Sequence, residues 1–582
     1  MAFRKPSPPR TGHDRITWVS WGIAIFVVAI VVRLFYLQVV NHGLYAALAE
    51  GQHAIFEKLL PERGEVFFRD ATSPNEVFPL IANREKRLVY AVPKRVVDPA
   101  ATAEKVATLL DLDPVVLQER LAKPDDGYEP LKHGVDVDVV GKLDALQLAG
   151  IESSPELTRY YPFGATAGSV TGFLGYDGDA RVGQYGLEGY YEKELAGEQG
   201  RLRSDDDAGG RLLSVGRQTI QEARDGDSLL LTIDRSVQQT ACDKLADAVA
   251  KHGARGGQVI IIQPKTGTIL AMCSEPTYDP NEYNEVEEVS AYRNGAIFDE
   301  YEPGSVMKAM TLSAALDQKL LTPETTYEDT GSVEIGKYTI RNADNKTYGI
   351  QTMNQVLEQS INTGAIFAVQ KLGPDRFRDY LERFGFGTTT DVALQGESDG
   401  DISALSKKGD IYSATASFGQ GFSVTPMQLV MAFAAIANDG KLMKPRIVDT
   451  IIKPNGFQET VAPEAVRQVI SPETARTIKA MLVNVVRNGH GQRAGVPGYY
   501  VGGKTGTAQV PYGDRPGYHP DEHIGTFVGF APLNEPAFVM LAKIDVPRDV
   551  RFAESSAAPL FGDLASFLLN YYQVPPDDES GN

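Results

Sequence analysis

Residues 16–40, ITWVSWGIAIFVVAIVVRLFYLQVV, form an apolar run that limits what this chain can fold into more than any other feature. Arg33 is the one charged residue in the run, and it lies near the far end, where a long side chain reaches the membrane interface. The run is long enough for the ~20 residues that an α-helix needs to cross a bilayer. The sequence therefore predicts a single membrane-spanning helix.

The charges in front of this run set its expected orientation. Because cytosolic flanks carry the excess of Lys and Arg, residues 1–15 are predicted to be a cytosolic tail, and the chain after residue 40 to lie outside the plasma membrane. A cleaved signal peptide is the competing interpretation, with Ala47-Leu48-Ala49 as its small-residue site. A retained anchor is favoured because the run exceeds the ~7–15 residues of a signal segment. The basic residues are Arg4, Lys5, Arg10 and Arg15.

Composition excludes some classes of function. The 582 residues carry a formal net charge of −19 without a long Lys/Arg run after the first fifteen, so no large nucleic-acid interface is expected. This length favours more than one domain, and a hydrophobic fraction of 42% is typical of globular protein. The only cysteines are Cys242 and Cys273, whose pairing is not readable from the sequence. We expect buried or unpaired thiols.

A change in the length of the apolar segments divides the chain into a stalk and a larger folded part. Residues 41–222 mix short strand and helix patterns, with helices predicted at 103–110 and 113–122, and are interpreted as a non-catalytic stalk. Residues 223–573 contain longer apolar elements, and residues 574–582 form a polar tail.

The larger part is predicted to be an α+β domain. It opens with a strand at 228–234, a helix at 236–252 and a hairpin formed by 257–263 and 267–273. Helices are expected at 305–317, 353–372, 374–384, 426–438 and 472–487, and strands near 499–509, 524–531 and 537–546. An antiparallel sheet that both chain ends complete, flanked by helices, fits this order.

The first chemical motif is Ser305-Val-Met-Lys308. Pro303 and Gly304 precede it, so Ser305 is expected at a helix start with Lys308 one turn further on. A serine attacks poorly until a neighbouring group removes its proton, and a neutral lysine can do so. Burial or a second cation such as Lys504 must then lower the lysine pKa from its usual ~10.4. Taken alone, the spacing is more often a capping serine beside a surface lysine.

The second motif is Ser360-Ile-Asn362, predicted to lie in a turn between helices. A hydroxyl there could relay a proton to a leaving group, and the Asn362 amide could orient a substrate peptide group. The same spacing at Ser73-Pro-Asn75 has no evident role, so this motif is weak by itself.

The third motif is Lys504-Thr-Gly-Thr507, on a predicted strand. A lysine and two hydroxyls at a strand edge could bind a carboxylate, while Gly506 would let the backbone approach a substrate. The same four residues recur at Lys265-Thr-Gly-Thr268, where a hairpin turn explains them.

Two further patterns are interpreted as coincidences. Gly498 to Thr505 matches a phosphate-binding P-loop, but the glycine and proline residues around it do not favour the required helix. His519-Pro-Asp-Glu-His523 matches a zinc signature, but it leads into a strand and is expected to be a polar loop. No metal site or cofactor is therefore predicted.

In this order, downstream of an anchor, the three motifs resemble those of the class B penicillin-binding proteins, which are monofunctional D,D-transpeptidases. The resemblance covers about residues 33–570. One departure is Phe67-Phe-Arg-Asp70, where relatives commonly carry Asp-Arg-Asn-Gly, and it leaves open the stalk contacts of that segment. Other similar segments include Arg63-Gly-Glu-Val66, Arg159-Tyr-Tyr-Pro-Phe-Gly164, Gly186-Leu-Glu-Gly189, Glu302-Pro-Gly-Ser305 and Ser417-Phe-Gly-Gln-Gly421.

The resemblance implies acyl transfer on peptidoglycan. Ser305 would attack a stem pentapeptide at its penultimate D-alanine, and an acceptor amine of a neighbouring stem would then take the acyl group. It implies catalytic roles for Ser305, Lys308, Ser360, Asn362 and Lys504, and substrate binding by Thr505, Gly506 and Thr507. It also implies a β-lactamase-like fold on a pedestal, covalent inhibition by β-lactams, and a membrane-embedded glycan polymerase with divisome proteins as partners in septal wall synthesis.

Two alternatives of other classes stay open at this point. A D,D-carboxypeptidase or β-lactamase would use water in place of the acceptor amine, and would release product without crosslinks. A non-catalytic β-lactam-binding scaffold would bind but not turn over.

Overall fold

The computed structural model describes residues 61–577 except 74, 125, 179 and 204–218, and also residues 21, 26–28 and 30. The chain divides into two compact units, residues 1–62 with 197–225 and residues 63–196 with 226–582. In the first unit, the described chain forms a hairpin of β7 (Arg201–Arg203) and β8 (Thr219–Gln221). The elements that follow belong to the second unit.

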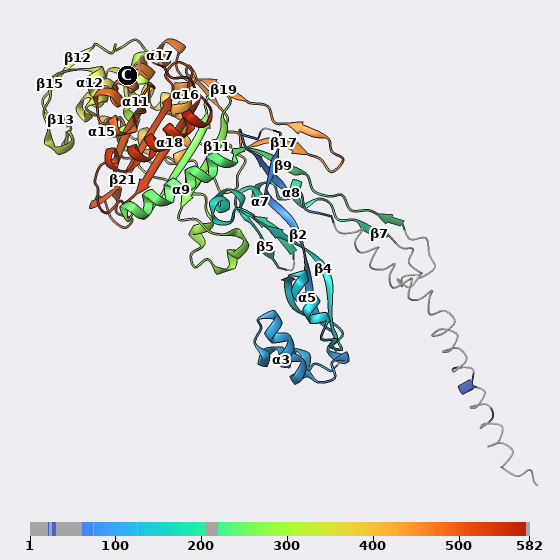
Figure 1. Cartoon of the computed structure of the whole chain (residues 1–582). Helices are drawn as coiled ribbons and strands as arrows, with labels where there is room; N and C mark the ends of the chain where they lie inside the picture. Colours follow the sequence, from blue (N-terminus) through green and yellow to red (C-terminus); the bar gives the residue numbers. More distant parts are fainter. Residues whose placement is uncertain are drawn as a thin grey trace, which may run out of the picture. The chain divides into compact units, whose positions relative to one another are not determined.

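A five-stranded antiparallel sheet lies at the centre of the part after residue 226, in the order β11-β10-β22-β21-β20 (Figure 1). Its strands are β10 (Gly256–Gln263), β11 (Thr268–Glu275), β20 (Gly502–Pro511), β21 (Tyr518–Ala531) and β22 (Phe538–Asp545). Val259 and Ile261 of β10 pack into one core and Ile260 and Ile262 into another. Because both faces are buried, the strand is a continuous apolar run rather than an alternating one.

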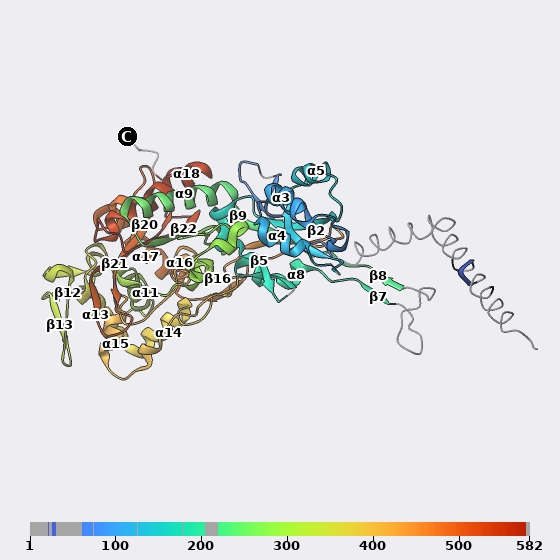
Figure 2. The same ribbon diagram turned by 90° about the horizontal axis from the view of Figure 1, so that it is seen from below.

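Helices cover both faces of this sheet (Figure 2). On one face lie α9 (Arg235–His252) and α18 (Ala557–Tyr571), which contact each other. On the other face α16 (Pro426–Ala437) packs against the strands, and α11 (Lys308–Asp317) shares the same core. The predicted α+β class with an antiparallel sheet flanked by helices is confirmed.

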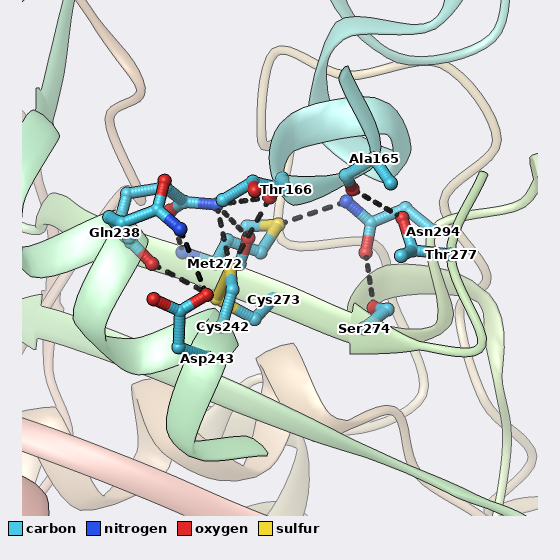
Figure 3. Close-up of a disulfide and its surroundings, with 11 residues drawn as sticks. Ala165, Thr166, Gln238, Cys242, Asp243, Met272, Cys273, Ser274, Thr277 and Asn294 are labelled. Atoms are coloured by element: carbon cyan, nitrogen blue, oxygen red, sulfur yellow. Dashed lines mark hydrogen bonds between the residues drawn. A yellow bond between two sulfur atoms is a disulfide. The ribbon is translucent and has the colours of Figure 1, made fainter. Parts of the chain in front are cut away.

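A disulfide joins the only two cysteines, so the expectation of thiols is wrong. Cys242 lies on α9 and Cys273 on β11, with their sulfur atoms 2.01 Å apart and their Cα atoms 5.3 Å apart (Figure 3). The Gln238 side chain, one turn before Cys242, donates to the Met272 carbonyl on the strand and fixes the same contact. Packing of α9 on β11 brings the two cysteines together, and their separation of 31 residues could not reveal this.

The stalk contributes most strands of a second, seven-stranded sheet. Its path is β18-β17-β9-β1-β2-β3, and β4 also pairs with β2. β9 (Ser228–Asp234) runs parallel to β1 and leads directly into α9, so strands from before and after residue 222 share one sheet. The others are β1 (Val66–Arg69), β2 (Val77–Ala91), β3 (Glu129–Val135), β4 (Ile151–Tyr160), β17 (Val448–Ile452) and β18 (Gln458–Thr460).

Within the stalk, α3 (Pro99–Leu110) and α4 (Pro114–Leu121) pack together near the predicted ranges. Fully buried Glu188 accepts from Arg159 at 2.6 Å and from Arg63 at 2.5 Å. Although burial alone would raise it, these two guanidinium groups hold the pKa of Glu188 below its ordinary value. Three of the segments that carry the family resemblance therefore meet at one buried charge cluster.

Residues 67–70, which differ from the sequence that relatives commonly carry, also have defined contacts. The Asp70 carboxylate accepts from the Ser236 hydroxyl on α9 at 2.6 Å and from the Tyr571 hydroxyl on α18 at 3.0 Å. The end of β1 is thereby tied to both helices that cover one face of the five-stranded sheet.

The predicted membrane-spanning segment, residues 16–40, lies mostly outside the described residues. Within the part of the chain that the structure describes, no helix combines the length and apolar character needed to cross a membrane.

Candidate active site

Ser305 lies in a 3₁₀ turn, η6 (Gly304–Met307), immediately before α11, as its predicted place at a helix start requires. Gly304 has φ +62° and donates its backbone N–H to the Gly419 carbonyl at 3.0 Å. Glu302 accepts from the Gly421 N–H at 2.9 Å and from the Tyr518 hydroxyl at 3.1 Å. The turn is therefore fixed from two sides before any substrate binds.

Ser360 interrupts the helix that was predicted over 353–372. The structure has two helices, α12 (Met353–Glu358) and α13 (Asn362–Leu372), and Ser360 lies between them with φ 54°. The long helix is therefore wrong, whereas the turn predicted for the second motif is present. A non-glycine residue in the left-handed region is uncommon and costs energy, and such residues cluster at functional sites.

Lys504 extends from β20, and Gly506 brings that strand against the Ser305 turn. A Cβ at Gly506 would lie 2.8 Å from the Pro303 carbonyl oxygen, so only glycine fits without a backbone shift. Lys504 Nζ donates to Ser360 Oγ at 3.0 Å and to the Thr505 carbonyl at 3.2 Å. Strand β20 thus contacts both of the other motifs.

Lys308 Nζ is the centre of the cluster. It lies 3.0 Å from Ser305 Oγ, 2.5 Å from the Ser360 carbonyl oxygen, 3.2 Å from Ser360 Oγ and 2.8 Å from Asn362 Oδ1. The other end of the Asn362 amide donates to the Arg341 carbonyl at 3.0 Å, which fixes its orientation. Residues from positions 305, 308, 360, 362 and 504 therefore meet around one amine.

Burial sets the protonation of the two lysines, whose side chains are both fully buried. Burial lowers the pKa of Lys308 well below its ordinary value, and the charge of Lys504 lowers it further. Burial likewise lowers the pKa of Lys504 to about 7, against the attraction of Glu554. Since both amines contact Ser360 Oγ, a charge on one disfavours a charge on the other.

A neutral Lys308 matches its surroundings by count. An uncharged amine has two N–H donors and one lone pair. In the neutral form the Ser360 carbonyl and Asn362 Oδ1 can take the two donors, which leaves the lone pair toward the two hydroxyls, Ser305 Oγ at 3.0 Å and Ser360 Oγ at 3.2 Å. This is the arrangement of a nucleophile with its base in place.

The cluster opens into a cavity of about 570 Å³. Thr505 and Thr507 line it, and the Thr507 hydroxyl accepts from the Ala553 N–H at 3.1 Å, which leaves its proton free to donate. Across the cavity, Arg551 faces Asp344 at 3.7 Å. The Asn362 amide and the hydroxyls of Ser305, Ser360, Thr505 and Thr507 thus border one space.

Sequence reasoning did not find several residues that also line this cavity. They are Arg341, Asp344, His490, His523, Arg551 and Glu554. His490 Nδ1 lies 3.1 Å from Glu554, and that carboxylate is close enough to raise the pKa of Lys504. These residues lie outside the three motifs, and the one spacing pattern that includes any of them, His519 to His523, was interpreted as a coincidental zinc signature.

The patterns that the sequence analysis interpreted as coincidences do not form the sites that they resemble. Lys265-Thr-Gly-Thr268 forms the turn between β10 and β11, as predicted. Lys504 and Thr505 lie within a strand rather than at a helix start. His519 to His523 is the beginning of β21, so the predicted loop is wrong. Among the described residues, no three His, Cys, Asp or Glu side chains are placed to hold a metal ion.

Two family models match the chain. The penicillin binding protein transpeptidase domain matches residues 257–566, which include all three motifs. The penicillin-binding protein dimerisation domain matches residues 58–231.

Individual relatives match over nearly the whole length. Stage V sporulation protein D of Bacillus subtilis is 34% identical over 573 residues, 97% of this chain and 87% of the relative. A probable peptidoglycan D,D-transpeptidase, PenA, of Neisseria meningitidis is 30% identical over 576 residues, 98% of this chain and 94% of the relative.

A solved structure agrees with this. Penicillin-binding protein 3 of Mycobacterium tuberculosis, in complex with ampicillin, superposes with a TM-score of 0.69 and 27% identity, over 90% of this chain and 98% of that one. Sequence, fold and site therefore agree, and the chain belongs to the class B penicillin-binding proteins, the peptidoglycan D,D-transpeptidases.

Proposed function

We propose that Ser305 is the nucleophile of a D-alanyl-D-alanine transpeptidation reaction. Ser305 Oγ attacks the carbonyl of the penultimate D-alanine, and Lys308 accepts the hydroxyl proton. The observation that carries this proposal is the contact of a fully buried amine of lowered pKa with Ser305 Oγ at 3.0 Å. General-base assistance of this kind contributes about 10²–10⁴ in rate.

The other site residues complete the first half-reaction. Ser360, between both lysines, passes the proton from Lys308 to the amine of the departing D-alanine. Lys504 in its charged form, with Thr505 and Thr507, binds the terminal carboxylate, and Gly506 lets the peptide approach. Asn362 holds Lys308 and keeps one amide N–H for the substrate. The backbone N–H groups of Ser305 and Thr507 bind the oxyanion, where one donor is worth about 2.7–4 kcal/mol.

In the second half-reaction an acceptor amine of a neighbouring stem attacks the Ser305 ester, forms the crosslink amide and releases Ser305. β-Lactams acylate Ser305 as mimics of the donor, a proposal that the ampicillin complex of the relative supports.

We also propose the cellular setting. Residues 16–40 span the plasma membrane once with residues 1–15 in the cytosol, residues 41–222 form the pedestal, and residues 223–573 act outside on the wall. Five described residues in the first of these segments are helical with exposed apolar side chains, among them Trp21 and Phe26. Septal synthesis beside a membrane-embedded glycan polymerase and divisome proteins is the proposed role.

The test is covalent labelling of the detergent-solubilised full chain by a fluorescent penicillin. Wild type and the matched serine control Ser73→Ala should be labelled, and Ser305→Ala should not. Absence of label on folded wild type would exclude the acyl-enzyme and favour the scaffold alternative.

Product analysis separates transfer from hydrolysis. With stem pentapeptide and an acceptor stem, the transpeptidase yields crosslinked dimer. Free tetrapeptide alone would assign the chain to the D,D-carboxypeptidases.

A further inference from the structure

Strand register places His523 beside the substrate-binding threonines. In the β20–β21 pair, His523 stands directly opposite Gln509, and Thr507 opposite Gly525. Paired residues share a face of the sheet, as do alternate residues along a strand. His523 therefore lies on the same face as Thr505 and Thr507, diagonally next to Thr507, and it borders the same cavity.

The imidazole of His523 has an unused nitrogen. The residue is only 7% exposed, and its Nε2 is buried without a hydrogen-bond partner. A backbone contact at Asp521 raises the pKa of the ring, and because Nε2 has no partner we assign that contact to Nδ1 as the donor. In that tautomer Nε2 carries a lone pair and accepts a proton or an N–H.

The surroundings keep this ring neutral. Burial lowers the pKa of His523, and Arg551 lowers it further, against the opposite effect of Asp521. The other acidic, basic and histidine side chains that line the cavity are Arg341, Asp344, Lys346, His490 and Glu554, and Asp545 on β22 lies opposite Ile524. His490 also lines the cavity, with its Nδ1 3.1 Å from Glu554, but its side chain is 40% exposed, whereas the Nε2 of His523 is buried without a partner.

Aminolysis has a proton requirement that the motif residues alone do not meet. An acceptor amine arrives as an ammonium ion and must lose one proton before it can attack and a second as the amide forms. Lys308 and Ser360, retracing the first half-reaction, deliver the second proton to Ser305 Oγ as the ester breaks. By reversibility the acceptor amine occupies the place of the departed D-alanine amine, on the side of Thr507.

We propose that His523 binds the acceptor amine and removes its first proton. This inference rests on the proposed function. The ammonium N–H donates to Nε2, the proton passes to the imidazole, and the neutral amine attacks the acyl carbon. The C–N bond forms while the C–O bond to Ser305 breaks, and the imidazolium later gives its proton to water. Because Nε2 is buried, a side chain at this end of the cavity must shift before the acceptor can reach it. We assign this movement to Arg551, which lines the same cavity, is 60% exposed and is held by a 3.7 Å ion pair to Asp344 of the kind that contributes little.

The experiment measures how the acyl-enzyme divides between amine and water. An N-acyl-D-alanyl thioester serves as donor for the full chain, with two acceptor probes. The ε-amine of Nα-acetyl-lysine amide has a pKa of about 10.4 and the α-amine of glycine amide about 8. At pH 7, His523→Gln should lower transfer to the ε-amine about tenfold or more and transfer to the α-amine less, with fluorescent-penicillin acylation within twofold of wild type.

The matched control is His519→Gln, a histidine of the same strand whose ring packs on Tyr512 and does not line the cavity. It should behave as wild type. Transfer by His523→Gln should also recover toward wild type as the pH approaches the pKa of the acceptor.

Equal transfer by wild type and His523→Gln overturns the inference, and so does an equal loss for both acceptors or a parallel loss of acylation, which would indicate a structural role. A wild-type chain that acylates but transfers to neither probe or to an acceptor stem contradicts the proposed function itself.

Discussion

The tetrapeptide Lys-Thr-Gly-Thr occurs at two places in this molecule, and the two copies have different structures and different surroundings. Lys265 is on a hairpin turn, 55% exposed, 3.7 Å from Glu535. Lys504 lies within a strand, fully buried, against Ser360. Gly267 has φ +72° because the turn requires it, whereas Gly506 is needed for the close approach of Pro303. The comparison teaches that strand position and burial, not the motif, create the chemistry.

The largest expected difference is between the two lysines. Lys504→Ala should reduce the rate of penicillin acylation at least about 100-fold. The variant loses the amine that holds Ser360 and helps to lower the pKa of Lys308. Lys265→Ala should leave the rate unchanged. Stopped-flow acylation measures both, and a comparable loss in the two variants would refute the distinction.

Loss of the disulfide, which joins α9 to the strand after the Lys265-Thr-Gly-Thr268 turn, should lower the stability of the fold without changing the acylation chemistry. Cys273 lies on β11, which follows that turn, and the closed loop of 31 residues corresponds to about 3–4 kcal/mol. The double variant Cys242→Ala/Cys273→Ala should have a free energy of unfolding lower by this amount, measured by denaturant titration. Its folded fraction should be acylated at the wild-type rate. Slower acylation per folded molecule would show that the disulfide also positions the site.

The two glycines should fail in different ways. A Cβ at Gly267 would lie 2.2 Å from the Lys444 carbonyl oxygen, so Gly267→Ala should cost about 1–3 kcal/mol of stability. Gly506→Ala should instead lower acylation by pushing β20 away from the Ser305 turn. Thermal unfolding and acylation rates together test this, and the reverse pattern would contradict it.

The lysines should also differ in how stability depends on pH. The folded-state pKa of Lys504, about 7, is below the ordinary 10.5, so the unfolded chain binds more protons between these values. The cost of burying Lys504 is therefore complete below about pH 7 and disappears as the pH rises to 10.5. Lys504→Met should raise stability most at pH 6 and least near pH 10, whereas Lys265→Met should show no such trend. Denaturant titrations at both pH values measure it.

The smallest effect should come from the ion pair of the turn copy. Lys265 and Glu535 are 55% and 83% exposed, and pairs of this kind contribute at most about 1 kcal/mol. Glu535→Gln should leave both stability and acylation close to wild type, by thermal unfolding and by labelling. A clear loss of either would mean that the turn has a role beyond closing the hairpin.

The sequence predicted most elements of the catalytic part and the residues that meet at its centre, because apolar periodicity and three short motifs were sufficient. It missed α18, whose apolar pattern is interrupted by Pro559 and Gly562. Its predicted helix over 353–372 is wrong, although a turn is expected at Ser360, because no glycine or proline marks where the helix ends. The pairing of Cys242 with Cys273 depends on how α9 packs on β11. The register of β21 on β20 places His523 at the cavity, and the chain after β22 brings Arg551 and Glu554 there. Neither the register nor the path of this segment can be derived from patterns in a single sequence.

Strand β20 is the last strand of its sheet, with β21 as its only neighbour among the described strands. The other edge of its backbone therefore keeps N–H and C=O groups unmatched by a sheet partner, and a row of such groups accepts an extended peptide as a further strand. On the proposed reaction, the stem peptide binds by β-augmentation before any side chain is read. Recognition of this kind uses backbone groups that every extended peptide shares, so by itself it does not select a stem sequence.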